Sequence, residues 1–89
     1  MKSHTAGQFW KLFAALPADI RKQAYKAYAQ FVRDRFYPGL NFEEVNRRTG
    51  LWSARITDDY RVLGYRDGGE VVWFWVGPHT EYEKLLRRR

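Results

Sequence analysis

Hydrophobic side chains recur every three or four positions in the first 36 residues and at every second position after residue 50. The first spacing is typical of an amphipathic helix and the second of a strand. Thr5 and Gln8 form a capping-box pattern, in which two side chains satisfy free backbone N–H groups at a helix start. The stripe that follows ends before Pro17 and consists of Phe9, Trp10, Phe13 and Leu16. We therefore predict a short first helix between Thr5 and Pro17.

A second, longer helix is predicted from Pro17 to about Phe36. Proline fits the first turn of a helix because its missing N–H has no intrahelical partner there, and Asp19 suits the positive end of the helix dipole. The segment Tyr37-Pro38-Gly39 stops the pattern. The buried stripe of this helix is expected to consist of Ile20, Ala24, Ala27, Tyr28 and Phe31.

Alternating hydrophobic positions, rich in Trp, Tyr, Val and Ile, predict strands at about 51–57, 60–66 and 70–77. Gly68 and Gly69 tolerate the positive φ angles of a tight turn, so the last two strands are expected to form a hairpin. A short last helix is predicted at 80–87. Two helices, three strands and a helix, without room for long crossovers, indicate an α+β fold with an antiparallel sheet.

The hairpin register divides the strand residues between two faces, because directly opposed residues share a face. The missing side chain of Gly64 is expected to leave space for the indole of Trp73. The face under the helices should carry Trp52, Ala54, Ile56, Val62, Gly64, Trp73 and Trp75. The second face should carry Arg61, Leu63, Tyr65, Val72, Phe74 and Val76.

Two arginines are predicted to lie side by side on this second face. A three-residue loop, Thr57-Asp58-Asp59, places Arg55 directly opposite Arg61, whereas a two-residue loop would put them on opposite faces. The second face is otherwise apolar, which is unusual for a sheet in contact with water. We therefore expect a partner protein, a ligand or the last helix to cover it.

Composition narrows the class of protein. The chain has 89 residues, a net charge of +6 and no cysteine. One domain of this size accommodates a single core, and the positive charge favours polyanionic partners such as nucleic acid. Most of this charge lies in the helical half, because residues 1–50 contain 9 cations and 4 anions, whereas residues 51–89 contain 7 and 6. The lack of cysteine, of a signal peptide and of a membrane-length apolar run predicts a cytoplasmic protein.

Two segments carry a resemblance to a known family. Residues 51–63 and 72–82 have the sequences LWSARITDDYRVL and VWFWVGPHTEY, and the segments Phe13 to Pro17 and Pro38 to Phe42 also fit. In this order they resemble the RelE/ParE superfamily toxins of bacterial type II toxin–antitoxin modules, mainly the RelE-like branch. The resemblance implies two N-terminal helices packed on a small twisted antiparallel sheet of three to four strands, a short C-terminal helix, and an antitoxin that wraps the toxin.

The resemblance leaves three functions open. RelE-like members cleave mRNA in the ribosomal A site without a metal, through basic residues and a tyrosine or histidine on the concave face of the sheet. ParE-like members act on DNA gyrase without nuclease chemistry, and a third possibility is an inactive homologue that only binds protein. Glu43 and Glu44 stand where related sequences have cations. The N-terminal strand of RelE is expected to be absent, since the capping pattern begins at Thr5.

The RelE-like activity needs a base for the ribose 2′-OH, cations for the phosphorane and an acid for the leaving 5′-oxygen. Arg55 and Arg61 offer planar guanidinium forks for the phosphate. Histidine exchanges protons near neutral pH, so His79 is the predicted acid or base, and Tyr82 is expected to orient the reaction or protonate. RNA-binding residues are predicted to be Arg47, Arg48, Arg66, Lys84 and Arg87. Neither a metal nor another cofactor is expected.

Each catalytic candidate also has a purely structural alternative. His79 follows Gly77-Pro78, where a histidine is often a helix cap or a surface residue. Arg55 can form a surface pair with Asp58 or Asp59, and Tyr82 can pack in the core of the last helix. The terminal arginines at 87–89 either bind phosphates or complement the negative end of a helix dipole.

Overall fold

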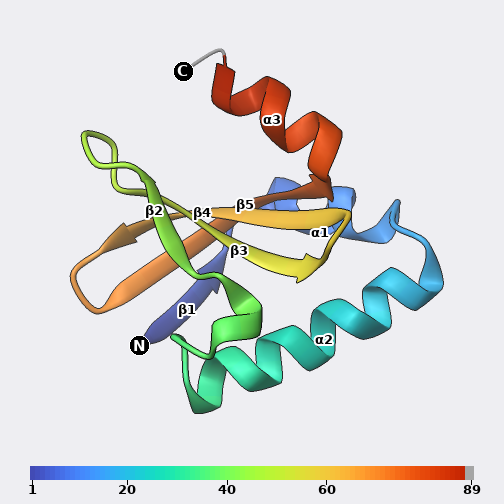
Figure 1. The fold of residues 1–89 in the computed structure, drawn as a ribbon, viewed down its shortest axis with the longest axis horizontal. Coiled ribbons are helices and arrows are strands. Elements are labelled where there is room, and N and C mark those ends of the chain that lie inside the picture. Colours follow the sequence, from blue (N-terminus) through green and yellow to red (C-terminus); the bar gives the residue numbers. More distant parts are fainter. Residues whose placement is uncertain (88–89) are drawn as a thin grey trace.

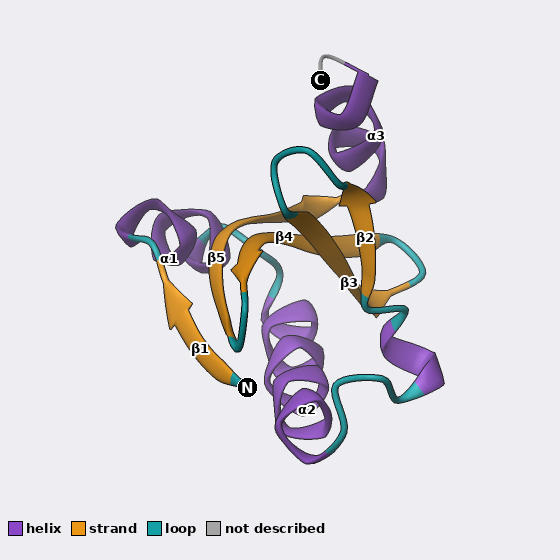
Figure 2. Cartoon of the chain, turned by 90° about the vertical axis from the view of Figure 1, so that its left-hand side faces the viewer, coloured by secondary structure: helices purple, strands orange, loops and turns teal. Residues whose placement is uncertain are grey.

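A five-stranded sheet in the order β1-β5-β4-β3-β2 forms the centre of the computed structural model, which describes residues 1–87 (Figure 1). Helices α1 and α2 lie on one side of the sheet, and α3 lies on the opposite side (Figure 2). The elements are β1 (Lys2–Thr5), α1 (Gly7–Ala14), α2 (Ala18–Arg33), the 3₁₀ helix η1 (Pro38–Leu40), β2 (Glu43–Asn46), β3 (Leu51–Thr57), β4 (Tyr60–Asp67), β5 (Glu70–Pro78) and α3 (His79–Arg87). The α+β class and the order of the central elements are confirmed.

Strand β1 was not expected, and it makes the sheet mixed rather than antiparallel. It runs parallel to β5, from the pair Lys2 and Glu70 to the pair Thr5 and Trp73. Its sequence, KSHT, contains no hydrophobic residue, so the alternation that indicates a strand is missing. The strand is instead held by backbone pairing, and the hydroxyl of Ser3 accepts a hydrogen bond from Trp73 Nε1 at 2.8 Å.

The predicted capping box is wrong. The residue before α1 is Ala6, and no side chain caps the helix. Thr5 belongs to β1, and its hydroxyl accepts a hydrogen bond from Trp10 Nε1 at 2.8 Å. Gln8 turns to the sheet and donates to the backbone carbonyl of Phe74 at 3.1 Å. Both polar side chains therefore join α1 to its neighbours rather than closing the helix on itself.

Helix α2 ends at Arg33, three residues before the predicted end at Phe36. Asp34 is extended, with φ −157°, and its carboxylate accepts a hydrogen bond from the N–H of Phe36 at 3.0 Å. A short polar side chain that bonds backbone two residues ahead competes with helix continuation. The helix therefore ends before Pro38, the residue that was expected to stop it.

Arg55 and Arg61 face each other as predicted, but a β-bulge rather than a three-residue loop places them there. Arg55 pairs with Arg61, and Thr57 pairs with Tyr60, so the loop has two residues rather than three. The register shifts between Arg55 and Thr57, which is the pattern of a β-bulge. The bulge supplies the odd residue that the longer loop was expected to provide.

A second bulge corrects the predicted faces of the last hairpin. The pairing is as expected from Asp67 to Gly64, but Leu63 then pairs with Trp75 instead of Phe74. Trp75 consequently moves to the second face, and Val76 takes a place in the core under α1 and α2. An alternation counted from the turn could not show this, because one extra residue in a strand reverses every position beyond it.

Two hydrophobic cores lie on opposite faces of the sheet. The larger core is covered by α1 and α2, and its buried members are Phe9, Phe13, Leu16, Phe31, Leu40, Phe42, Ala54, Val71, Trp73 and Val76. The smaller core is covered by α3 and consists of Leu51, Leu63 and Tyr82, with Leu85, Leu86 and Trp75 packed against it. Of the three covers considered for the second face, the last helix is the one that the structure shows.

Gly64 is a position where a side chain would not fit. A Cβ atom there would lie 2.8 Å from Cε3 of Trp73 and 3.0 Å from the carbonyl oxygen of Val72. We expect Gly64→Ala to lower the free energy of unfolding by about 1–3 kcal/mol, because the indole and the backbone must move apart. Urea denaturation followed by circular dichroism measures this change. Gly69→Ala is the matched control, since a Cβ at that hairpin position meets nothing within 4 Å. An equal loss in both variants would contradict the prediction.

Candidate functional site

The predicted catalytic residues gather where β4 begins, β5 ends and α3 starts. Arg61 pairs with Gly77 across the two strands, and His79 follows two residues later. The N–H of His79 donates to the carbonyl oxygen of Asp59 at 2.6 Å, which ties the first residue of α3 to the β3–β4 turn. The fold thus brings Arg55, Arg61 and His79 to one end of the sheet, although they come from three different elements.

The two arginines are held differently. Arg61 Nη1 donates to the carbonyl oxygens of Thr57 at 2.6 Å, Asp58 at 3.2 Å and Tyr60 at 3.2 Å, so this guanidinium also stabilises the β3–β4 turn. Arg55 forms an ion pair with Asp58, with 2.7 Å between Nη2 and Oδ1. An exposed pair of this kind contributes at most about 1 kcal/mol. A phosphate can therefore compete with Asp58 for Arg55.

His79 and Tyr82 are stacked on one another. Their ring centroids are 5.7 Å apart and their planes differ by 23°. The Tyr82 hydroxyl points into the smaller core and donates to Ser53 Oγ at 3.2 Å, and both residues are buried. The ring of Tyr82 therefore supports the imidazole, while its hydroxyl is engaged beneath the surface.

Two residues of this site escaped the sequence analysis. Ser53 lies on the same strand face as Leu51, so its place in the alternation marked it as a buried polar residue. Glu83 follows His79 by four residues, the spacing at which helical side chains meet, and its Oε1 lies 2.8 Å from His79 Nε2. The spacing of both residues was visible in the sequence, but their contacts with Tyr82 and His79 depend on the fold.

The predicted RNA-binding residues are divided between the two ends of the sheet. Arg47 and Arg48 lie in the β2–β3 turn, at the opposite end of β3 from Arg55. The guanidinium of Arg66 lies 4.5 Å from the Trp52 ring centroid, a cation–π arrangement. On α3, Lys84 is 3.7 Å from Glu81, and Arg87 is 4.0 Å from Glu83. Lys84 and Arg87 thus share α3 with His79, whereas Arg47 and Arg48 lie at the far end of β3, and the terminal arginines 88 and 89 lie outside the described residues.

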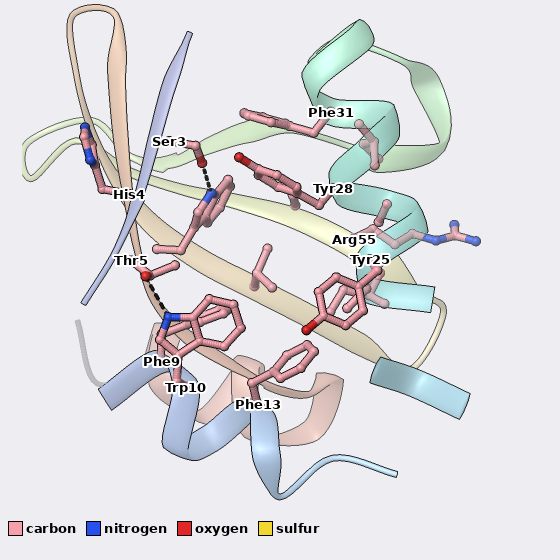
Figure 3. A pocket seen from close by; sticks show the side chains of 17 residues that line it. Ser3, His4, Thr5, Phe9, Trp10, Phe13, Tyr25, Tyr28, Phe31 and Arg55 are labelled. Atoms are coloured by element: carbon pink, nitrogen blue, oxygen red, sulfur yellow. Dashed lines mark hydrogen bonds between the residues drawn. The ribbon is translucent and has the colours of Figure 1, made fainter. Parts of the chain in front are cut away.

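An apolar cavity of 350 Å³ opens between β1, α1, α2 and the sheet, and Arg55 of the candidate site is one of the residues that line it (Figure 3). Its floor includes Trp73 and its entrance is lined by aromatic side chains that remain exposed: Trp10 at 48%, Tyr25 at 60% and Tyr28 at 47%. Residues 1–33 contain six cations and one anion, Asp19. A hydrophobic surface with exposed aromatic side chains is thus found on the helical face, whereas a contact site was expected on the other face.

Residues 1–87 contain no group of three or more His, Asp or Glu side chains that could hold a metal ion. None of the helices described is both long and apolar enough to span a membrane.

Comparisons with known proteins place this arrangement in context. The model of the ParE-like toxin domain matches residues 18–84. A chain of the RelB–RelE antitoxin–toxin complex from Methanococcus jannaschii superposes with a TM-score of 0.73 at 14% identity, over 92% of this chain and 96% of that chain. The YoeB/ParE toxin from Agrobacterium tumefaciens gives 0.67 at 19% identity, over 89% and 99%. The isolated RelE toxin of E. coli gives 0.62 at 13% identity, over 99% and 98%. No curated protein matches the chain.

Proposed function

The chain belongs to the RelE/ParE superfamily of toxins from type II toxin–antitoxin systems, and we propose that it is a ribosome-dependent, metal-independent endoribonuclease that cleaves mRNA and inhibits translation. The observation that carries this proposal is the convergence of Arg55, Arg61 and His79 at one end of the sheet. Two guanidinium groups can stabilise the charge on the phosphorane, and one imidazole can exchange one of the two protons that the reaction moves.

The proposed reaction is an internal displacement at phosphorus. The 2′-oxygen forms a bond to the phosphorus and loses its proton, while the bond from phosphorus to the 5′-oxygen breaks and the leaving oxygen gains a proton. Arg55 and Arg61 stabilise the negative charge that develops on the phosphorane, and His79 exchanges a proton with a reacting oxygen. Tyr82 orients the imidazole through the stacked pair of rings.

Induction in cells tests this function when mRNA integrity and DNA supercoiling are followed separately. Cleaved mRNA with normal supercoiling supports the endoribonuclease. Intact mRNA with blocked gyrase supports the second candidate, a ParE-like toxin that acts by contact. This candidate is favoured by one observation, which is that Arg61 Nη1 and the Tyr82 hydroxyl already have partners within the protein. Absence of toxicity would indicate an inactive homologue that only binds protein.

The partner of the free toxin is proposed to be its cognate antitoxin. Homologous chains were crystallised as antitoxin–toxin complexes from Methanococcus jannaschii and Pyrococcus horikoshii. In this chain, the cavity between α1 and α2 has an apolar floor and exposed aromatic side chains, and the segment 1–33, which contains β1, α1 and α2, has six cations and one anion. An amphipathic helix with acidic flanks complements both the apolar surface and the charge.

The antitoxin interface can be tested at the entrance of this cavity. We expect the double change Tyr25→Ala and Tyr28→Ala to weaken antitoxin binding about 10- to 100-fold, because exposed aromatic side chains supply much of the energy at such interfaces. Isothermal titration calorimetry measures the affinity. Tyr37→Ala is the control, since Tyr37 is equally exposed at 47% but lies outside the cavity. An unchanged affinity in the double variant would place the antitoxin elsewhere on the toxin.

A further inference from the structure

Three cations follow one another along the outer side of α2. Lys22, Lys26 and Arg33 lie within about 40° of one another around the helix axis, because the helix has about 3.6 residues per turn. We propose that this basic stripe docks the protein on the phosphate backbone of ribosomal RNA, apart from the mRNA that is cleaved. The inference rests on the proposed ribosome-dependent function and deepens it, because that function leaves open which surface of the protein contacts the ribosome.

The basic stripe faces solvent because the opposite side of α2 is buried. Phe31 is 6% exposed, packs in the larger core and lies about 180° from Lys22 around the helix. All three residues of the stripe are exposed. The sheet separates this side of the molecule from α3, which begins at His79 (Figure 2). An RNA bound along α2 therefore leaves the candidate site free for a second RNA.

The charges of the basic stripe are not neutralised within the protein. None of the ion pairs among residues 1–87 includes a residue of the stripe. Asp19 is the only acidic residue of α2, and it pairs with none of the three cations. On α3, by contrast, Lys84 and Arg87 each lie within 4.0 Å of a glutamate. A row of cations without carboxylate partners attracts a polyanion.

The spacing of the basic stripe suits a nucleic-acid backbone. With a rise of about 1.5 Å per residue, Lys22 and Lys26 are about 6 Å apart along the axis, and the whole stripe is about 16 Å long. A phosphate backbone carries negative charges at intervals of a few ångström, so one strand laid along α2 meets all three cations. Ala29 lies on the same side, between Lys26 and Arg33, and its small side chain lets a backbone approach the helix closely.

The basic stripe has a different chemistry from the cavity between α1 and α2. The entrance of the cavity carries the exposed rings of Tyr25 and Tyr28, which suit a protein helix. Within the stripe, the exposed apolar residue is Ala29, which is too small to serve as an anchor for a protein partner. The lysine ammonium is a compact point charge that binds phosphate without reading sequence. These features favour an RNA backbone over a protein as the partner of the stripe.

The basic stripe ends at a small cavity beyond the last turn of α2. This cavity has a volume of 180 Å³, and its lining includes Arg33, Asp34 and Arg35. The carboxylate of Asp34 accepts a hydrogen bond from the N–H of Phe36, whereas Nε of Arg35 is buried and has no acceptor among the described residues. Guanidinium groups are strong donors to phosphate oxygens. A phosphate at this end of the stripe therefore meets two arginines.

Binding to ribosomes without mRNA tests the docking surface. The double variant Lys22→Gln and Lys26→Gln is compared with the double variant Lys2→Gln and Lys11→Gln, because all four lysines are exposed and each variant loses two positive charges. We expect the stripe variant to bind about 10- to 100-fold more weakly at about 0.1 M salt. The slope of log K against log salt should become shallower by about 2, one for each lost phosphate contact. The control variant is expected to bind like the parent protein.

A photo-crosslink identifies the partner of the basic stripe. The chain has no cysteine, so Ala29→Cys provides a single attachment point for a benzophenone between the cations. We expect the label to form its crosslink on the ribosome with ribosomal RNA. A crosslink to a ribosomal protein instead would overturn the RNA assignment and indicate an acidic protein surface as the partner.

The outcomes separate this inference from the proposed function. Equal weakening of both double variants, or full binding by both, would overturn the docking surface, while mRNA cleavage by the parent protein still supports the endoribonuclease. Selective weakening of the stripe variant supports the docking surface, even if the parent protein cleaves no mRNA and the endoribonuclease is wrong. A parent protein that does not bind ribosomes would overturn both. Circular dichroism checks that the variants are folded, which is expected because glutamine and lysine have similar helix propensities.

Discussion

His79→Ala is expected to lower the rate of mRNA cleavage on the ribosome about 100-fold or more and to remove toxicity on induction. Positioned acid–base groups contribute about 10²- to 10⁴-fold to such reactions, and His79 is the single histidine at the site. Cleavage is measured by primer extension on a defined mRNA in a reconstituted translation system, with toxicity scored as growth after induction.

The protein offers a natural control for this substitution. His4 is the other histidine of the chain, lies in β1, and contacts a glutamate, Glu70, at 3.4 Å. We expect His4→Ala to cleave mRNA like the parent protein. If His79→Ala remains as toxic as the parent while both variants fold, the catalytic assignment is wrong and a contact toxin becomes the better explanation.

Leu63→Ala is expected to destabilise the domain by about 2–5 kcal/mol, a large part of the roughly 5–15 kcal/mol that is typical of small domains. Leu63 is 1% exposed and lies in the smaller core, where Tyr82 and Leu85 of α3 pack against the sheet. Its truncation leaves a cavity under α3. Because His79 is the first residue of that helix, cleavage activity is expected to fall together with stability.

Thermal and urea unfolding measure this effect. Val32→Ala is the control, since this aliphatic side chain is 67% exposed on α2 and its truncation should change the free energy of unfolding by less than about 0.5 kcal/mol. If Leu63→Ala were as stable as the parent protein, the contact between α3 and the sheet would contribute little, and α3 could not hold His79 in place.

Much of the fold was predictable because it depends on residues that are close in the chain. Helix α2 begins after Pro17 as expected, and the strands β3, β4 and β5 agree with the predicted ranges to within about one residue. The turn at Gly68 has the positive φ of 58° that the glycine pair indicated. Trp73 is buried beside Gly64, which lacks a side chain, as the register implied.

The errors have a common cause in contacts between distant segments. Strand β1 is polar and is held by pairing with β5, about 68 residues away, and by side-chain bonds to Trp73 and Trp10, so no local pattern indicates it. The bulges at Ile56 and Phe74 insert one residue each, and the second reversed the predicted faces of Trp75 and Val76. The local alternation of hydrophobic residues does not show where the pairing register between two strands shifts.

The candidate site also has features that local sequence predicts and features that depend on contacts between distant segments. The residue types, the spacing of His79 and Tyr82, and the pairing of Arg55 with Arg61 followed from local pattern and hairpin register. Packing between distant elements determined that α3 covers the second face, that the Tyr82 hydroxyl bonds Ser53, and that an apolar cavity opens beside α2. The same packing determined that Glu83 contacts Nε2 of His79 and that Nδ1 of His79 is buried. Periodicity specifies which residues share a face, whereas burial and hydrogen-bond partners depend on which elements that face meets.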